Sequence, residues 1–215
     1  MKIQRIAIHS LWLITFTALI AVIQPQAAQA QAPQGKPATV RGKISAVEKQ
    51  ALRVTTSAGE VLVKLPDDVR IGGVEAAKLS DITAGNYVGT TAVKQADGNL
   101  KALEVHIFPE SSRGTGEGHR PWDLQPGSTM TNANVEKVEQ VAVEKVQGQL
   151  LTLKYKDGEQ KVFIPPGTPI VKNVPGDQSL LKPGTGVYVA AVRGEDGTLT
   201  ATRITVGVGG IMPPM

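Results

Sequence analysis

The strongest constraint on the fold is an internal repeat. At an offset of 99 residues, Lys43–Ile107 aligns with Ala142–Val206 without a gap, and 17 of the 65 aligned pairs are identical. Unrelated segments of average composition would share about four. The alignment places "ADGNLKA", residues 96–102, opposite "EDGTLTA", residues 195–201. We therefore expect one structural unit to occur twice, with the same turn lengths in both copies.

Each unit is predicted to be β-structure. Val61, Val63 and Leu65 alternate with other residues, a pattern typical of a strand with one buried face. Strands are expected over 39–48, 51–56, 60–66, 87–94 and 100–108, with a short helical turn within 76–82 and its counterpart within 177–181. Turns with positive φ are expected where glycine follows a small or acidic residue, at Gly59, Gly98, Gly158 and Gly197.

Five strands with a helical turn after the third are the layout of an OB-type barrel. The prediction is an all-β protein of two tandem OB-like small β-barrels related by internal duplication. The first barrel covers 38–108 and the second 135–207, with a Gly/Pro-rich connector at 109–134 and a flexible tail at 208–215. Units of about 70 residues are marginal alone, so we expect the barrels to pack together or to share strands.

The beginning of the second copy has an ambiguous pattern. Val135, Val138 and Ala142 have helical spacing. The repeat favours a strand instead, because it aligns Val143 and Val146 with Ile44 and Val47 of a predicted strand.

The amino terminus has the three parts of a secretory signal. Lys2 and Arg5 precede an apolar core, and Ala28-Gln29-Ala30 forms a small-x-small cleavage site. We expect residues 1–30 to be a signal peptide, cleaved after Ala30, and the mature chain to be periplasmic with no membrane span. The alternative is a retained membrane anchor. Without Lys2 and Arg5 the formal charge falls from +4 to +2, which does not indicate a polyanion partner.

Several segments resemble a known group of proteins. "GTLTATRI" after "LKPGTGVYV", preceded by "GQLLTLKYKDGEQKVFIP", resembles a bacterial domain of unknown function with a predicted OB-like barrel. With "ALEVHIFPESSRGTGEGHRPWD" between two such units, the mature chain resembles uncharacterised exported proteins of Gram-negative bacteria. Some members carry an automatic label as metal-transport components, even permeases. The resemblance implies location and fold, and it makes metal binding worth testing.

Two glutamate–histidine pairs are the candidate metal ligands. Glu104 precedes His106 by two positions, and Glu117 precedes His119 likewise. Residues two apart on a strand point to the same face. If the connector folds back, the four side chains would form an N2O2 set suited to zinc or copper. The alternative is that the first pair is an exposed polar face and the second pair is solvated connector.

Catalysis and nucleic-acid binding are not indicated. The chain has no cysteine, and no serine near His119 has a base and an orienting group fixed beside it, so we expect no enzyme. "GTGEG" lacks the Lys-Ser/Thr that completes a phosphate loop. A nucleic-acid surface would need stacking aromatics in a basic groove, and the chain has only three Tyr, three Phe and two Trp.

The connector differs in composition from a flexible spacer, because it contains charged and aromatic residues. It contains Arg113, Arg120, Trp122 and Asp123, which we take as candidate partner- or ligand-binding residues. A free linker would be mostly small and polar, so we favour an ordered strap anchored by Trp122 over a flexible tether. The predicted function is a periplasmic, non-enzymatic binding or interaction protein without a cofactor, whose partner is a small ligand or another envelope protein. The alternative is a zinc- or copper-binding accessory protein.

Overall fold

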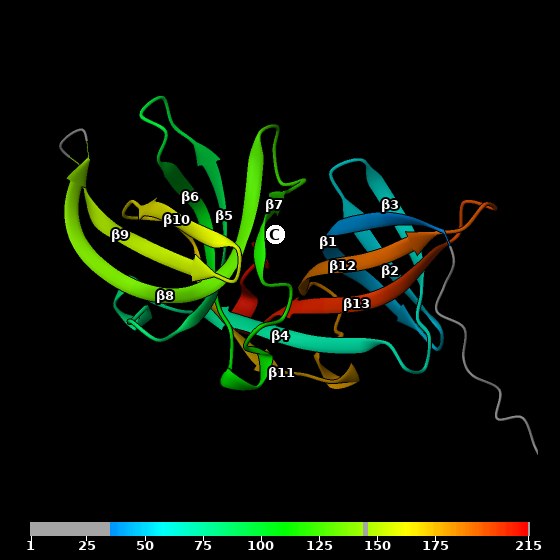
Figure 1. Ribbon diagram of the computed structural model, residues 1–215. Coiled ribbons are helices and arrows are strands. Elements are labelled where there is room, and N and C mark those ends of the chain that lie inside the picture. The colour runs from blue at the N-terminus through cyan, green and yellow to red at the C-terminus, as the bar shows by residue number, and fades with distance from the viewer. Residues whose placement is uncertain (1–34, 144–145, 215) are drawn as a thin grey trace, which may run out of the picture. The chain divides into compact units, whose positions relative to one another are not determined.

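The computed structural model describes residues 35–143 and 146–214, so the predicted signal peptide lies outside the described residues. This part of the chain is all-β (Figure 1). The strands are β1 (Lys36–Glu48), β2 (Ala51–Thr56), β3 (Gly59–Lys64), β4 (Arg70–Ala76), β5 (Tyr87–Lys94), β6 (Leu100–Ile107), β7 (Gly118–Pro121), β8 (Ser128–Val143), β9 (Val146–Tyr155), β10 (Gly158–Ile164), β11 (Ile170–Pro175), β12 (Gly186–Arg193) and β13 (Leu199–Gly207).

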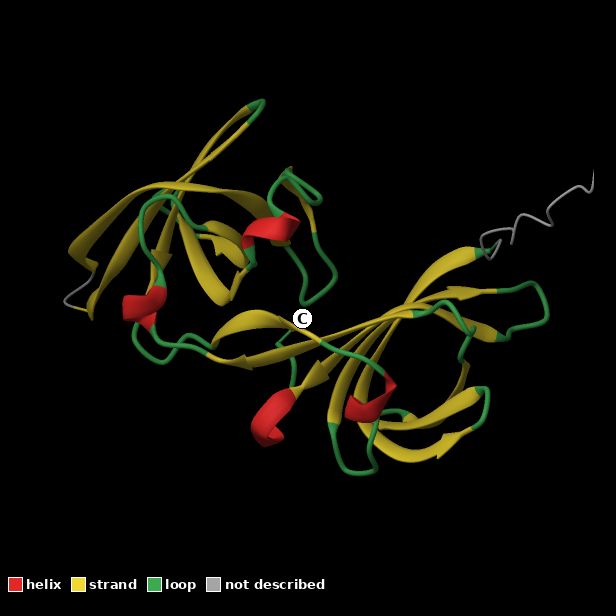
Figure 2. Cartoon of the chain, turned by 90° about the horizontal axis from the view of Figure 1, so that it is seen from below, coloured by secondary structure: helices red, strands yellow, loops and turns green. Residues whose placement is uncertain are grey.

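The only helical elements among these residues are short 3-10 turns in the connections (Figure 2). They are η1 (Leu79–Asp81), η2 (Glu110–Ser112), η3 (Gln178–Leu180) and η4 (Val208–Gly210). The turns η1 and η3 fall where the sequence predicted a helical turn in each copy. Within the described ranges, no helix is long and apolar enough to cross a bilayer.

The strands close into two hydrogen-bonded rings. The first ring runs β1–β2–β3–β13–β12 and returns to β1. The second ring runs β8–β9–β10–β6–β5 and returns to β8. Figure 1 shows the two groups of strands separately. Closure leaves few unpaired strand edges, which removes the main aggregation hazard of β-structure.

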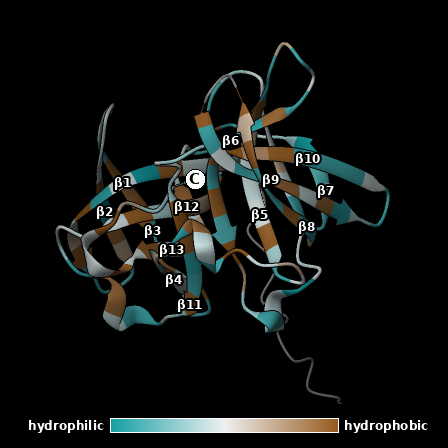
Figure 3. Ribbon diagram, turned by 90° about the vertical axis from the view of Figure 1, so that its left-hand side faces the viewer, coloured by the Kyte–Doolittle hydropathy of each residue, from teal (hydrophilic) through white to brown (hydrophobic). Residues whose placement is uncertain are grey.

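Each ring takes strands from both halves of the chain. The first core combines residues from β1, β2 and β3 with residues from β12 and β13. The second combines β5 and β6 with β8, β9 and β10. Hydrophobic residues alternate with polar ones along many of these strands (Figure 3). The sequence ranges 38–108 and 135–207 therefore do not enclose one ring each, because the last two strands of each copy complete the ring of the other.

Two strands that the sequence analysis treated as connections carry the chain between the rings. The strand β4 pairs with β13 of the first ring and with β11, and β11 pairs in turn with β6 of the second ring. Gly72 and Gly73 made β4 look like a loop, since glycine is depleted in strands. A Cβ at Gly73 would lie 2.8 Å from Val174 Cγ2 of β11, so the two strands approach closely only because that position has no side chain.

The repeat register holds from β2 onward but not in the first strand of each copy. A bulge interrupts the β1–β2 ladder between Ile44 and Ala46, and a matching bulge interrupts β8–β9 between Val135 and Lys137. Val135 therefore corresponds to Ile44, an offset of 91 rather than 99. The predicted alignment of Val143 with Ile44 was wrong, although the strand itself is present. The reason is that the β8–β9 hairpin continues four residue pairs further, to Val143 opposite Val146.

The glycine turns are mostly as predicted. Gly59, Gly98 and Gly197 have φ values of 121°, 86° and 80°. Gly158 is the exception: it does not have positive φ, and it already opens β10 after a turn at residues 156–157.

The connector and the tail are both ordered where the structure describes them. The last seven residues of the connector, 128–134, are the start of β8 and pair with β5, so they belong to the second ring. The tail packs back onto the protein: Pro213 is buried, and a Cβ at Gly207 would lie 1.9 Å from the Ile211 carbonyl oxygen. The predicted flexible tail was wrong because Gly209 and Gly210, both with positive φ, turn the chain back.

Candidate functional site

Glu104 and His106 share one face of β6, as predicted, but that face is buried. Their side chains are 1% and 2% exposed. Thr91 Oγ1 donates to Glu104 Oε1 at 2.6 Å, and His106 Nε2 lies 2.7 Å from the Pro214 carbonyl oxygen. A carbonyl only accepts, so His106 carries its proton on Nε2 and donates it there. The alternative prediction, that Glu104 and His106 form an exposed polar face, was therefore wrong.

Burial dominates the ionisation of both groups. Desolvation raises the pKa of the Glu104 carboxyl to about 7, against the opposing effect of the Thr91 hydrogen bond. Desolvation lowers the pKa of His106, against the effects of its hydrogen bonds to Pro214 and Asn173. The pair is thus a buried polar contact, with Glu104 Oε1 3.9 Å from His106 Nε2, in which the imidazole is neutral at pH 7.

The other predicted metal ligands lie elsewhere. Glu117 is exposed, and its Oε1 accepts a hydrogen bond from the Lys156 backbone N–H at 3.1 Å. His119 is exposed on β7, with Nδ1 2.8 Å from Thr131 Oγ1. Nowhere in residues 35–143 and 146–214 do three His, Cys, Asp or Glu side chains gather in a way that could hold a metal ion. The four-ligand set predicted from the sequence does not assemble, because β7 lies against β8 and not against β6.

The predicted strap is ordered and reaches the first ring. β7 pairs with β8, and the Trp122 backbone N–H donates to the Ser128 carbonyl at 2.9 Å. The Arg120 guanidinium lies 5.7 Å from the centre of the Trp122 ring. Asp123 accepts hydrogen bonds from Arg41 at 2.8 Å and from Thr39 at 2.7 Å, both on β1. Arg120, Trp122 and Asp123 thus lie close together at the end of β7 and directly after it, and the hydrogen bonds of Asp123 connect this segment to β1.

Arg113, the fourth predicted binding residue, lies apart from these three. It pairs with Glu110 at 2.5 Å, donates to the Gly85 carbonyl at 2.9 Å and bonds Asn134. Its guanidinium also lies 6.0 Å from the centre of the Tyr87 ring. These contacts fix the start of the connector, which is a structural role.

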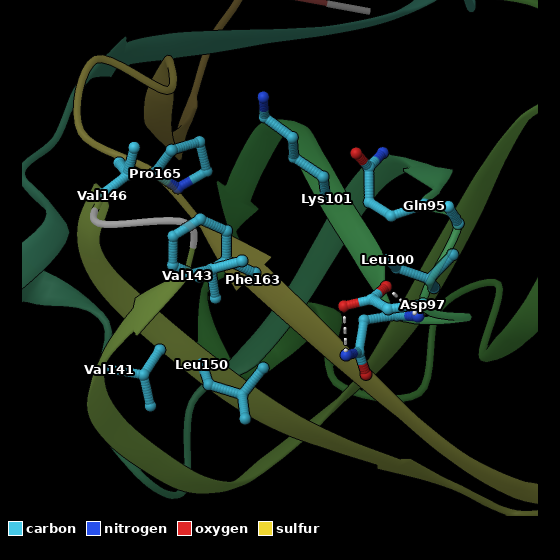
Figure 4. Close-up of a pocket in the computed structure, with 12 residues that line it drawn as sticks. Gln95, Asp97, Leu100, Lys101, Val141, Val143, Val146, Leu150, Phe163 and Pro165 are labelled. Carbon is cyan, nitrogen blue, oxygen red and sulfur yellow. Dashed lines mark hydrogen bonds between the residues drawn. The ribbon is translucent and has the colours of Figure 1, made fainter.

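A pocket that the sequence analysis missed lies at the far end of the second ring (Figure 4). This hairpin pocket has a volume of about 480 Å³. Its apolar wall consists of Val141, Val143, Val146, Leu150, Phe163, Pro165 and Leu100, and its polar rim of Gln95, Asp97, Asn99 and Lys101. The β8–β9 extension, the β5–β6 turn and the end of β10 supply these residues. The gapless repeat alignment concealed the extension that forms the wall.

Comparison with known proteins gives one match. Residues 142–205 match the family model of a domain of unknown function, DUF5666. No curated protein and no solved structure is similar to the chain. The matched range begins in the β8–β9 hairpin and ends in β13, so it covers strands of both rings. Residues 142–205 are therefore similar to a domain whose function is not known.

Proposed function

We propose that the chain is an exported, non-enzymatic binding protein of the bacterial periplasm, and that the hairpin pocket receives an apolar group of a small ligand. The observation that carries this proposal is the four-pair extension of the β8–β9 hairpin, which has no counterpart in β1–β2. Its valines line an open pocket instead of filling a core; Val146 is 44% exposed. A volume of 480 Å³ lies within the range of small-molecule sites.

The proposal includes the fold. We infer that each ring is an OB-like barrel and that the two arose by duplication, with their last two strands exchanged. The recurring ladder pattern supports this inference: Leu199 pairs with Val63 as Leu100 pairs with Val162, one repeat length apart. OB folds bind their ligands at the strand 1–2 and strand 4–5 loops. In the second ring those are the β8–β9 hairpin and the β5–β6 turn, the two segments that flank the hairpin pocket.

The lining indicates the chemistry of the ligand. Aliphatic side chains and one phenyl ring, Phe163, favour a hydrocarbon group over a stack of nucleobases. The rim residues are polar, so the ligand's polar end would face solvent there. A metal-binding role has less support, because Glu104 and His106 are buried and engaged without a third ligand.

A titration with decanoate and decyl maltoside tests the site, because the two probes share a chain and differ in head group. We expect both to shift the NMR signals of the hairpin pocket. Val146→Gln and Val143→Gln should each weaken binding about tenfold, since each removes apolar surface that the bound ligand would cover, worth about 1.5 kcal/mol. The matched control is Val47→Gln, which replaces a valine of similar exposure, 42%, at the shorter β1–β2 hairpin.

Two outcomes would contradict the proposal. One is that neither probe binds; the other is that Val47→Gln weakens binding as much as Val146→Gln. Export is tested separately: protein recovered from the periplasmic fraction should begin at Gln31, and a chain that keeps Met1 and remains with the membrane would contradict cleavage after Ala30.

A further inference from the structure

A second pocket lies where the outer faces of the two rings meet. This central pocket has a volume of about 200 Å³ and lies under the strap. Positions that the repeat aligns line it from both rings: Gly89 and His106 from β5 and β6, and Tyr188 and Thr205 from β12 and β13. The two copies differ at both positions, and Gly89 has no side chain where Tyr188 carries a phenol ring. A Cβ at Gly89 would lie 2.8 Å from Asn132 Oδ1 and from the Phe108 ring.

Two buried polar atoms of the lining residues have no hydrogen-bond partner in the protein. They are Trp122 Nε1, a donor, and Asn132 Oδ1, an acceptor. Asn132 is 7% exposed, and its Nδ2 donates to the Thr115 carbonyl at 3.1 Å, which fixes the amide orientation and leaves Oδ1 unpaired. Both residues line the central pocket, and Trp122 also borders the hollow beside Pro37 and Thr39. Buried polar groups are nearly always paired, so this unpaired donor and this unpaired acceptor lack a partner that a ligand could supply.

The pocket also has an excess of positive charge. Arg120 and Arg203 both contribute to its lining. Within the described part of the chain, neither guanidinium forms an ion pair; the Arg120 Nη1 donates to the Gly116 carbonyl at 2.8 Å. Asp123 of the strap is paired with Arg41 instead. Guanidinium groups bind carboxylates through paired N–H donors.

We propose that the central pocket binds a small carboxylate that carries its own hydrogen-bond donor, that is, a hydroxy or amino acid. The carboxylate accepts from Trp122 Nε1 and from the guanidinium groups of Arg120 and Arg203. The hydroxyl or ammonium group donates to Asn132 Oδ1. A volume of 200 Å³ is about seven times the share of one water molecule in the liquid, which limits the ligand to a few carbon atoms.

Calorimetric titration with four matched probes tests this site. Lactate and alanine carry both groups, propionate lacks the donor, and lactamide lacks the charge. We expect saturable binding of lactate or alanine, with propionate and lactamide at least about tenfold weaker. In a Trp12→Phe background Trp122 is the only tryptophan, so its fluorescence should change with the same binding curve.

Two substitutions probe the contacts. Trp122→Phe keeps an aromatic ring but removes the N–H, and Arg203→Gln removes a charge at an exposed position. Each should weaken binding about tenfold. The control, Arg193→Gln, changes an exposed arginine at the other end of β12 and should have no effect. The proposal is overturned if none of the probes binds at about 10 mM, if propionate binds as well as lactate, or if both substitutions leave binding unchanged. Val143→Gln separates this site from the hairpin pocket, because it should affect decanoate but not lactate.

Discussion

Each ring contains strands from both halves of the chain, which predicts that the two rings unfold as one unit. Leu52 on β2 and Leu151 on β9 are aligned by the repeat, and each is fully buried in a different core. Opening the first ring would release β12 and β13. These strands follow β11 in the chain, and β11 is hydrogen-bonded to β6 of the second ring. We therefore expect Leu52→Ala and Leu151→Ala to shift the same transition, although their side chains never meet.

The expected size of the shift follows from burial and chain length. Removing a fully buried leucine side chain leaves a cavity and costs about 3 kcal/mol of unfolding free energy. About 180 ordered residues have an unfolding entropy of about 0.4 kcal/mol/K at the midpoint, so each substitution should lower Tm by about 8 °C. The two cores are separate, so the effects should add, and the double variant should melt about 16 °C below the parent.

Scanning calorimetry on the parent, both single variants and the double variant measures this. We expect one peak in every case, with equal calorimetric and van't Hoff enthalpies. The control is Leu62→Ala, at a side chain 48% exposed on β3, which should change stability by less than about 0.5 kcal/mol. Two resolved transitions, each moved by only one of the substitutions, would refute the reasoning and indicate two independent domains.

Three further predictions concern the strap and the buried pair. The folded pKa of Glu104, about 7, lies above its ordinary 4.5, so its contribution to stability is complete below pH 4.5 and is lost as the pH rises to 7. We therefore expect the difference in unfolding free energy between the parent and Glu104→Gln, measured in urea titrations, to fall by about 3 kcal/mol between pH 4.5 and pH 7. A difference that does not change with pH would contradict the burial argument. Ser128 Oγ bonds the Trp122 and Gln125 carbonyls, so Ser128→Ala should speed native-state cleavage of the strap by thermolysin, and rapid cleavage of the parent would show a loose tether. Zinc titration should give no saturable one-to-one binding; stoichiometric uptake that is lost with His106→Ala and His119→Ala would restore the metal-binding hypothesis.

The sequence was a good guide to the elements with strong side-chain patterns. The predicted strand 51–56 coincides with β2, and Val63 lies in the core as its alternation predicted. The strands β4 and β11 were missed, because Gly72-Gly73 and Pro175 give weak β signals and their pairing partners lie far along the chain. Long-range pairing overrides local propensity in such segments.

The predictions for the candidate site residues were only partly correct, because they too depended on contacts between distant segments. The period of two along a strand correctly placed Glu104 and His106 on one face, but nothing local shows that the tail buries that face. The order of the strap agrees with the expectation drawn from its composition, whereas the contact between Arg120 and the Trp122 ring was not predicted. The hairpin pocket was invisible, since its valines were read as part of the repeated first strand.

The sequence by itself determined that the chain is β-rich, with turns at most of the predicted glycines, because strand alternation and turn conformation depend on neighbouring residues. Only the tertiary structure decided which strands complete which ring, how far the β8–β9 hairpin extends, and that Gly89 and Tyr188 line the same pocket. The ring assignments depend on backbone hydrogen bonds between strands far apart in the sequence, such as β1 and β12, where Lys36 lies opposite Arg193. Every strand offers the same N–H and C=O groups, so the local side-chain pattern of a strand does not by itself identify the strand that pairs with it.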